Sequence, residues 1–124
     1  MSSNKKILIV DDEKMNIMTL AFFLKQQYEI IVATDGVTAL EAAEKHMPDI
    51  ILLDIIMPDM DGFDVLVKLK NSDTTKNIPV IFITGLSDAG DEEKGLSLGA
   101  AGFIAKPFDK AVVKEKIDSI FANI

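Results

Sequence analysis

Cysteine is absent from this 124-residue sequence, and its absence excludes several kinds of chemistry. The protein has no disulfide, no thiolate metal site and no cysteine nucleophile, which is typical of proteins from a reducing compartment. No apolar run is long enough to cross a bilayer, and the first residues lack the hydrophobic core of a signal peptide. We therefore expect a cytoplasmic protein that does not insert into membranes.

Positive charge is also scarce, because arginine is absent and 13 lysines stand against 20 Asp and Glu, for a net charge of −7. Such a field repels polyphosphates, so we expect no direct nucleic-acid binding. Apolar residues nevertheless make up 48% of the chain. A chain of this length buries roughly two thirds of its unfolded surface on folding. We predict a single domain over residues 1–124.

Short apolar runs alternate along the chain with segments of helical periodicity. Five runs are predicted strands: Lys6–Val10, Glu29–Ala33, Asp49–Leu53, Pro79–Thr84 and Gly102–Ala105. Most of their residues are apolar on both faces, which is typical of parallel strands covered by helices on two sides. The sequence therefore predicts a single doubly wound α/β domain, with a five-stranded parallel sheet flanked by five helices.

Four of the five predicted helices carry an apolar stripe at helical spacing. The stripes are Ile17, Leu20, Ala21 and Leu24; Leu40, Ala43 and Met47; Phe63, Leu66 and Val67; and Val113, Ile117, Ile120 and Phe121. Asp35, Asp61 and Asp109 stand where helix N-caps belong. The fourth helix, predicted within residues 87–100, contains three glycines and a poor stripe, so we expect it to be the weakest.

Polar side chains follow four of the predicted strands at their carboxyl ends. Asp11 and Asp12 follow the first strand, Asp54 follows the third, Thr84 ends the fourth and Lys106 follows the fifth. Ligands of open parallel sheets bind beyond the carboxyl ends of the strands, at the point where the strand order reverses. We therefore expect three carboxylates, a hydroxyl and an ammonium group to converge on one rim.

Carboxylates crowded at one site repel one another, and at least one pKa rises unless a cation neutralises them. Oxygen ligands without cysteine or clustered histidine favour Mg²⁺, or Mn²⁺, over Zn²⁺. Mg²⁺ in turn favours a phosphoryl ligand, which Lys106 and Thr84 would contact. A flavin or nucleotide site is disfavoured, because the acidic loop Asp11–Lys14 offers no glycine-rich phosphate cradle.

Four motifs stand at these strand ends: ILIVDDE, IILLDIIMPDMDGFDVL, VIFITGLSD and GAAGFIAKPF. In this order they resemble the receiver domain of two-component response regulators over essentially the whole chain. The resemblance implies a CheY-like, flavodoxin-like fold with strand order 2-1-3-4-5. Receiver domains take a phosphoryl group from a sensor histidine kinase or a histidine phosphotransfer protein, and they act on a downstream protein target.

The resemblance assigns the phosphoryl chemistry to particular residues. Asp54 matches the phospho-accepting nucleophile, Lys106 matches the cation that pairs with the phosphoryl group, and Thr84 matches the hydroxyl that swings onto it. Phe103 matches the aromatic residue of the family's switch. The bond between Lys106 and Pro107 is cis in the family, so a cis bond is expected here.

The metal ligands are implied in the same way. Asp12 matches the carboxylate that usually touches Mg²⁺ directly, and Asp11 matches the one that acts through water. Asp54 and the backbone carbonyl of Ile56 match the remaining protein ligands. In the family, the lifetime of the phosphorylated state depends on the residues two places after the acceptor and two after the switch hydroxyl, which are Ile56 and Leu86 here.

We therefore predict a phosphorylation-activated signalling switch, not an enzyme that turns over a substrate. Phosphorylation of Asp54 would change the surface of the fourth helix, fifth strand and fifth helix to control a partner, and the same surface could support a homodimer. Two alternatives stay open: a Mg²⁺-dependent phosphohydrolase with an aspartyl nucleophile, and a scaffold receiver that is never phosphorylated. Turnover of a simple phosphate ester would favour the hydrolase.

Overall fold

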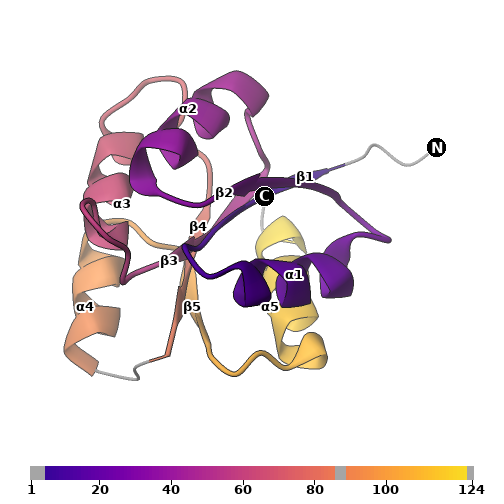
Figure 1. The fold of residues 1–124 in the computed structure, drawn as a ribbon. Coiled ribbons are helices and arrows are strands. Elements are labelled where there is room, and N and C mark those ends of the chain that lie inside the picture. The colour runs from indigo at the N-terminus through magenta and orange to yellow at the C-terminus, as the bar shows by residue number, and fades with distance from the viewer. Residues whose placement is uncertain (1–4, 86–88, 123–124) are drawn as a thin grey trace.

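The computed structural model describes residues 5–85 and 89–122, and a single parallel β-sheet lies at its centre (Figure 1). The strands are β1 (Lys6–Val10), β2 (Glu29–Ala33), β3 (Ile50–Asp54), β4 (Val80–Thr84) and β5 (Gly102–Ala105). They are hydrogen-bonded in the order β2-β1-β3-β4-β5, and every pairing is parallel. The five predicted strands and their order are therefore confirmed, except that β3 is displaced by one residue from the predicted Asp49–Leu53 and β4 begins one residue after Pro79.

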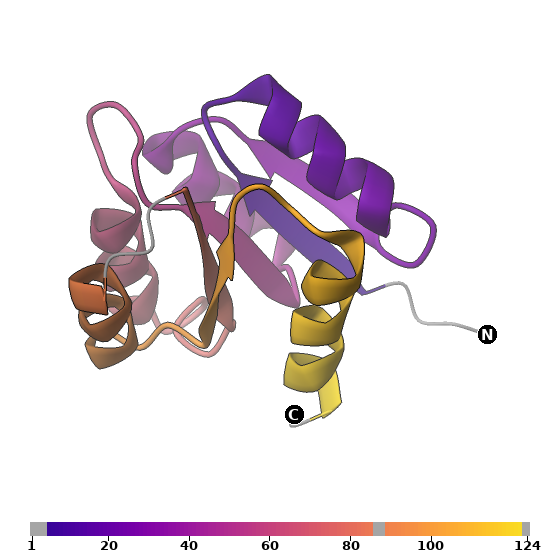
Figure 2. The same cartoon turned by 90° about the horizontal axis from the view of Figure 1, so that it is seen from below.

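Five helices cover the sheet: α1 (Lys14–Leu24), α2 (Gly36–His46), α3 (Gly62–Lys70), α4 (Ala89–Ser97) and α5 (Lys110–Ala122). Helices α1 and α5 lie on one face, and α2, α3 and α4 lie on the other, as Figure 1 and the turned view in Figure 2 show. The doubly wound arrangement is thus confirmed. Within the described ranges, no helix is both long enough and apolar enough to span a bilayer.

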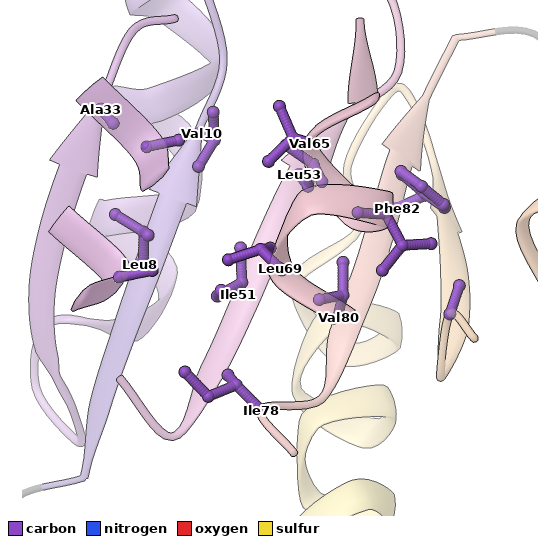
Figure 3. Close-up of a cluster of buried hydrophobic side chains, with 14 of the residues drawn as sticks. Leu8, Val10, Ala33, Ile51, Leu53, Val65, Leu69, Ile78, Val80 and Phe82 are labelled. Atoms are coloured by element: carbon purple, nitrogen blue, oxygen red, sulfur yellow. The ribbon is translucent and has the colours of Figure 1, made fainter. Parts of the chain in front are cut away.

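The core consists of two apolar layers, one on each face of the sheet, because side chains alternate along each strand. Strands β3 and β4 are buried along their whole length. One layer includes Leu8, Leu53 and Phe82 and packs against α2 and α3 (Figure 3). The other layer includes Leu52 and Ile83 and packs against α1 and α5. Burial on both faces explains why the strands lack polar alternation.

Aspartates begin three of the helices, as predicted. Asp35 Oδ1 accepts a hydrogen bond of 2.8 Å from a backbone amide in the first turn of α2. Asp61 Oδ1 accepts a bond of 2.9 Å from Asp64 N, and Asp61 N donates to Asp64 Oδ2 at 3.3 Å, so α3 begins with a capping box. Asp109 Oδ1 accepts bonds of 2.9 and 3.2 Å from amides at the start of α5.

Two of the predicted stripe residues are wrong. Met47 is 48% exposed because it ends α2 in the left-handed conformation, with φ of 48°, and therefore leaves the helical face. Val67 is 39% exposed because the buried side of α3 is centred on Val65, Leu66 and Leu69. Apolar spacing located each helix but not the limits of its buried side.

Helix α4 is shorter than the predicted segment, whose residues 87 and 88 lie outside the described part of the chain. It ends where Gly99 adopts a φ of 106°, a conformation that favours glycine. Gly99 N donates to Leu96 O at 3.0 Å, and Ala100 N donates to Gly95 O at 2.9 Å. This pair of bonds is a Schellman motif, so the glycine that lowers helix propensity also terminates the helix.

Candidate functional site

The candidate site is a pocket of about 430 Å³ at the carboxyl ends of β1, β3, β4 and β5. Its lining includes Asp12, Asp54, Ile56, Thr84 and Lys106. The structure thus brings together residues from four strand ends that are far apart in the sequence. This is the rim predicted from the alternation of strands and helices.

Asp54 is the last residue of β3 and is only 4% exposed. The chain after it turns back sharply, because Gly62 N donates a 2.7 Å hydrogen bond to Ile55 O. A Cβ on Gly62 would lie 2.4 Å from the backbone oxygen of Asp54, so only glycine fits at the start of α3. The loop between β3 and α3 is therefore held tightly against the residue at the centre of the pocket.

Asp11 and Asp12 are neighbours in the chain but differ in burial. Asp11 is fully buried, and its Oδ1 accepts a 2.9 Å hydrogen bond from Glu13 N. Among the residues that the structure describes, Asp11 Oδ2 has no hydrogen-bond partner. Asp12 is exposed and lines the pocket from its open side. Asp11 therefore offers a carboxylate from the buried side of the pocket, and Asp12 offers one from its open edge.

Lys106 provides the positive charge of the site. Its Nζ lies 3.4 Å from Asp11 Oδ2 and 3.4 Å from Asp54 Oδ1, and its side chain is 18% exposed. Its backbone is joined to β4, because Lys106 N donates a 2.8 Å hydrogen bond to Thr84 O. The bond to Pro107 is cis, as expected. One ammonium group thus faces two buried carboxylates.

The charge balance of the pocket is reflected in the pKa of Asp54. Burial raises the pKa of this carboxyl to about 6, and the negative charge of Asp11 acts in the same direction. The ammonium group of Lys106 opposes both effects but does not cancel them. The expected repulsion among crowded carboxylates is therefore present, and an additional positive charge would stabilise the ionised form of Asp54.

The three aspartates fit a divalent cation. Asp11, Asp12 and Asp54 each offer an oxygen, and these oxygens lie within 4.8 Å of one another. Asp11 Oδ2 gives a second reason, because this buried oxygen accepts no hydrogen bond within the described residues and has only the Lys106 ammonium, at 3.4 Å, to offset its charge. A set made only of oxygens suits Mg²⁺ or Mn²⁺. Ile56 lines the same pocket, and the role of its carbonyl as a ligand stays a prediction.

Thr84 and Phe103 lie on neighbouring strands and on the same face of the sheet. Phe103 pairs with Phe82 in the register of β4 and β5, and Thr84 follows Phe82 by two residues. The rings of Phe82 and Phe103 are 5.6 Å apart. Thr84 reaches the pocket, whereas Phe103 packs into the core behind it. Leu86, the second residue expected to influence lifetime, lies outside the described residues.

The sequence analysis missed an apolar surface beside the pocket. Helix α1 begins at Lys14, directly after the acidic loop, and its outer side carries Met15, Met18 and Phe22. These side chains are 72%, 64% and 66% exposed. The prediction for this helix considered only the apolar stripe of Ile17, Leu20 and Leu24, which packs against the sheet. The i, i+3, i+7 spacing of the exposed residues was the signal that could have revealed a second stripe.

The fold and the pocket define a CheY-like α/β domain with an acidic site at its strand ends. The family model described as the response regulator receiver domain matches residues 7–118. The chain therefore belongs to this family. The predicted family and fold are both confirmed.

Curated relatives support this assignment. The response regulator PleD of Caulobacter vibrioides is 46% identical over 93% of this chain, which corresponds to 26% of PleD. The alkaline phosphatase synthesis transcriptional regulatory protein PhoP of Bacillus subtilis is 36% identical over 94% of the chain, or 48% of PhoP. The chain thus spans about a quarter to a half of these relatives, and the domain limits 1–124 stay a prediction.

Solved structures agree on the fold. The chemotaxis protein CheY4 of Vibrio cholerae matches with a TM-score of 0.90 and 28% identity, over 94% of this chain and 98% of that one. The receiver domain of the sensor histidine kinase PA1611 from Pseudomonas aeruginosa matches with a TM-score of 0.83 and 28% identity, over 91% and 93%. That structure has a magnesium ion coordinated in its active-site cleft.

Proposed function

We propose that this receiver domain is a phosphorylation-activated switch in which Asp54 accepts a phosphoryl group from a sensor histidine kinase or a histidine phosphotransfer protein. The observation that carries the proposal is the position of Asp54. It lies almost buried in a pocket that opens at the strand ends, with Lys106 Nζ at 3.4 Å and two further carboxylates around it. Asp54 is therefore within reach of a phosphoryl group that enters the pocket, and the ammonium of Lys106 lies beside it to pair with the charge of that group.

The transfer is a nucleophilic displacement at phosphorus. An ionised oxygen of Asp54 forms a bond to the phosphorus of the donor phosphohistidine, and the bond from phosphorus to the imidazole nitrogen breaks. That nitrogen keeps the electron pair and takes up a proton from water. The product is an aspartyl phosphate. Because the pKa of Asp54 is about 6, the nucleophilic ionised form predominates near neutral pH.

Positive charge in the pocket offsets the charge of the incoming group. The Lys106 ammonium already lies 3.4 Å from Asp54 Oδ1, so it would need to move only a short way to pair with an oxygen of a phosphoryl group on Asp54. Mg²⁺ held by Asp11, Asp12, Asp54 and the carbonyl of Ile56 would supply further positive charge at the same place. Two observations support a role for Mg²⁺: the cluster of Asp11, Asp12 and Asp54 in this chain, and the magnesium ion in the active-site cleft of the PA1611 receiver domain.

The new dianion would then alter the surface of α4, β5 and α5. We infer that the Thr84 hydroxyl moves onto a phosphoryl oxygen, which leaves room for Phe103 behind it. Two existing conformations would be reweighted, and the altered surface would control a downstream protein or a homodimer contact. The placement of Thr84 and Phe103 on one face of neighbouring strands supports this coupling.

The exposed stripe of Met15, Met18 and Phe22 supports a protein as the phosphoryl donor. An apolar surface of this kind typically marks a site of contact with another protein. It begins within a few residues of Asp12, so a partner that covers it would also reach the mouth of the pocket. The phosphohydrolase alternative gains no comparable support, and the relatives PleD and PhoP are named as regulators.

Intact-protein mass spectrometry after incubation with a small acyl phosphate tests the proposal. With Mg²⁺ the parent protein should gain one phosphoryl group, and with a chelator in place of Mg²⁺ it should gain almost none. Asp54→Asn should gain none in either condition. Asp59→Asn, which alters an exposed carboxylate on the neighbouring loop, should behave like the parent. Equal phosphorylation of Asp54→Asn and the parent would refute the assignment.

A further inference from the structure

Three phenylalanine rings form a row beneath α4. Phe63 of α3 meets Phe82 of β4 edge to face at 5.3 Å, and Phe82 meets Phe103 of β5 at 5.6 Å. Two adjacent residues of helix α4 contact these rings. Lys94 Nζ lies 4.4 Å from the centre of the Phe63 ring, and Gly95 is buried against the other two rings. The helix thus rests on an aromatic surface that includes the expected switch residue.

Gly95 has no side chain because there is no space for one. A Cβ at this position would lie 2.6 Å from Cζ of Phe103 and 3.0 Å from Cε2 of Phe82. Its backbone is within α4 and is not in the left-handed region, so the conformation itself does not require glycine. Alanine would strengthen an ordinary helix at such a position. Glycine is therefore explained by the ring of Phe103, which occupies the volume of the missing side chain.

We propose that Gly95 is a positioning residue for Phe103: because it has no side chain, it leaves the space in which the ring packs against Phe82, here called the inward position. The ring and α4 then depend on each other, because the ring fills the gap in the helix and the helix covers the ring. Removing the ring from this place would leave α4 over an unfilled space, and closely packed surfaces resist such a space. The position of Phe103 would therefore be transmitted to α4 by direct contact.

The link to phosphorylation rests on the proposed function, whereas the contact itself does not. If phosphorylation of Asp54 draws Thr84 away and admits Phe103 to the vacated space, the contact at Gly95 is lost in the same event. The α4 helix would then shift toward Phe82 or loosen. A Cβ at residue 95 would act in the same direction without phosphate, because it excludes the ring from the inward position.

The first experiment measures the contact in the unphosphorylated protein. In Gly95→Ala we expect the nuclear Overhauser contacts between the rings of Phe103 and Phe82 to weaken at least severalfold, and we expect Tm to fall. The matched control is Gly102→Ala, because a Cβ at Gly102 meets nothing within 4 Å. This control should keep the ring contacts. Unchanged ring contacts together with a raised Tm in Gly95→Ala would overturn the proposal.

A second variant removes the ring edge. Phe103→Leu lacks the atom that the new Cβ would meet, so the loss of Tm caused by Gly95→Ala should largely disappear when both changes are combined. If Gly95→Ala alone does not fold, a folded double variant supports the proposal. A double variant that is as unstable as the sum of the single changes overturns it, because the conflict then lies elsewhere.

The third measurement connects the contact to the site. Gly95→Ala should bind beryllofluoride with Mg²⁺ about threefold or more tightly than the parent. The reason is that the new Cβ disfavours the state in which the Phe103 ring packs against Phe82, and this state competes with the one that binds beryllofluoride. Equal affinity in a variant whose ring is displaced would overturn the coupling to Asp54. If the parent itself does not bind beryllofluoride, the proposed function fails, while the ring contacts still decide whether Gly95 positions Phe103.

Discussion

Helices α3 and α4 lie side by side on the same face of the sheet, yet they are held in different ways (Figure 1). Helix α3 starts with the capping box of Asp61 and Asp64, and it buries the large side chains of Phe63, Leu66 and Leu69. Among the residues of α4 whose side chains are described, only Gly95 is buried. One helix is fixed by packing, and its neighbour rests on aromatic rings through a glycine.

If the proposed switch operates, this difference would divide the pocket into a fixed wall and a movable wall. The fixed wall contains Asp54 and the loop to α3, which Gly62 ties back to Ile55 with a 2.7 Å hydrogen bond. The other wall contains Thr84 and leads to α4. A switch needs a rigid acceptor and a neighbouring element that moves at low energetic cost. The packed helix α3 and the lightly held helix α4 lie side by side (Figure 1), so we expect mutations and phosphorylation to affect them differently.

The largest expected effect comes from truncating the packed helix. Leu66→Ala removes a fully buried side chain of α3 and should lower the free energy of unfolding by about 3 kcal/mol. Leu96→Ala makes the same chemical change on α4, where Leu96 is 53% exposed, and should alter it by less than about 0.5 kcal/mol. Urea denaturation measures both. Similar losses in the two variants would contradict the comparison.

The next largest effect on stability is expected when the negative charge of Asp54, in the fixed wall, is removed. Asp54→Asn removes a carboxyl whose pKa rises from 3.8 in the unfolded chain to about 6 in the folded protein. A raised carboxyl pKa means that ionisation opposes folding. Without divalent cations, the variant should therefore be more stable than the parent at neutral pH, by about 2 kcal/mol once screening by solvent in the open pocket reduces the full effect of the shift.

The pH dependence follows from the same shift. Below about pH 4 the carboxyl is protonated in both the folded and the unfolded chain, so the two proteins should be equally stable. Between about pH 4 and pH 6 the unfolded parent ionises first, and its stability falls relative to the variant. Urea denaturation with a chelator across this range measures the difference. A gain of the same size at both ends, or one shared by Asp59→Asn, would contradict the electrostatic cause.

Much of this arrangement was predictable from the sequence, because periodicity and strand ends are local signals. Three features needed no knowledge of long-range packing: the five strands, the three aspartate caps, and the convergence of Asp11, Asp12, Asp54, Thr84 and Lys106. The conserved geometry of parallel sheets brings strand ends together wherever such a pattern occurs. The positions of these five residues were therefore predicted correctly, whereas their chemical roles remain proposals.

Other features depend on contacts that no local pattern reveals. A glycine within a helix indicates weakness, and only the distance from Gly95 to the ring of Phe103 shows that it fits a particular side chain. The opposite burial of Asp11 and Asp12 likewise follows from the path of the chain after β1. The second stripe on α1 was hidden because apolar residues on both sides of a helix blur its periodicity.

A smaller effect is expected when phosphorylation acts on the two helices. Hydrogen exchange after treatment with a small acyl phosphate and Mg²⁺ should change about tenfold for amides of α4 and β5, which corresponds to about 1.4 kcal/mol. Amides of α3 should change less than about twofold, because its large buried side chains resist displacement. Asp54→Asn with the same reagent is the control. An even change over the whole domain would show that α3 is not a fixed element.

The smallest effect concerns the lifetime of the proposed aspartyl phosphate, which we expect to depend on Ile56 in the fixed wall. Ile56 lines the pocket and is 62% exposed, so its side chain lies where water approaches Asp54. Hydrolysis requires a water molecule in line with the phosphorus, and an alkyl side chain offers it no hydrogen bond. Ile56→Asn should therefore shorten the lifetime by a few-fold, or less than about 1 kcal/mol in the barrier. Val67→Asn, on the exposed side of α3, should leave it unchanged. The measurement is the loss of phosphate from Asp54 with Mg²⁺ after the donor is removed. A lifetime equal to or longer than that of the parent would show that Ile56 does not restrict the access of water to the aspartyl phosphate.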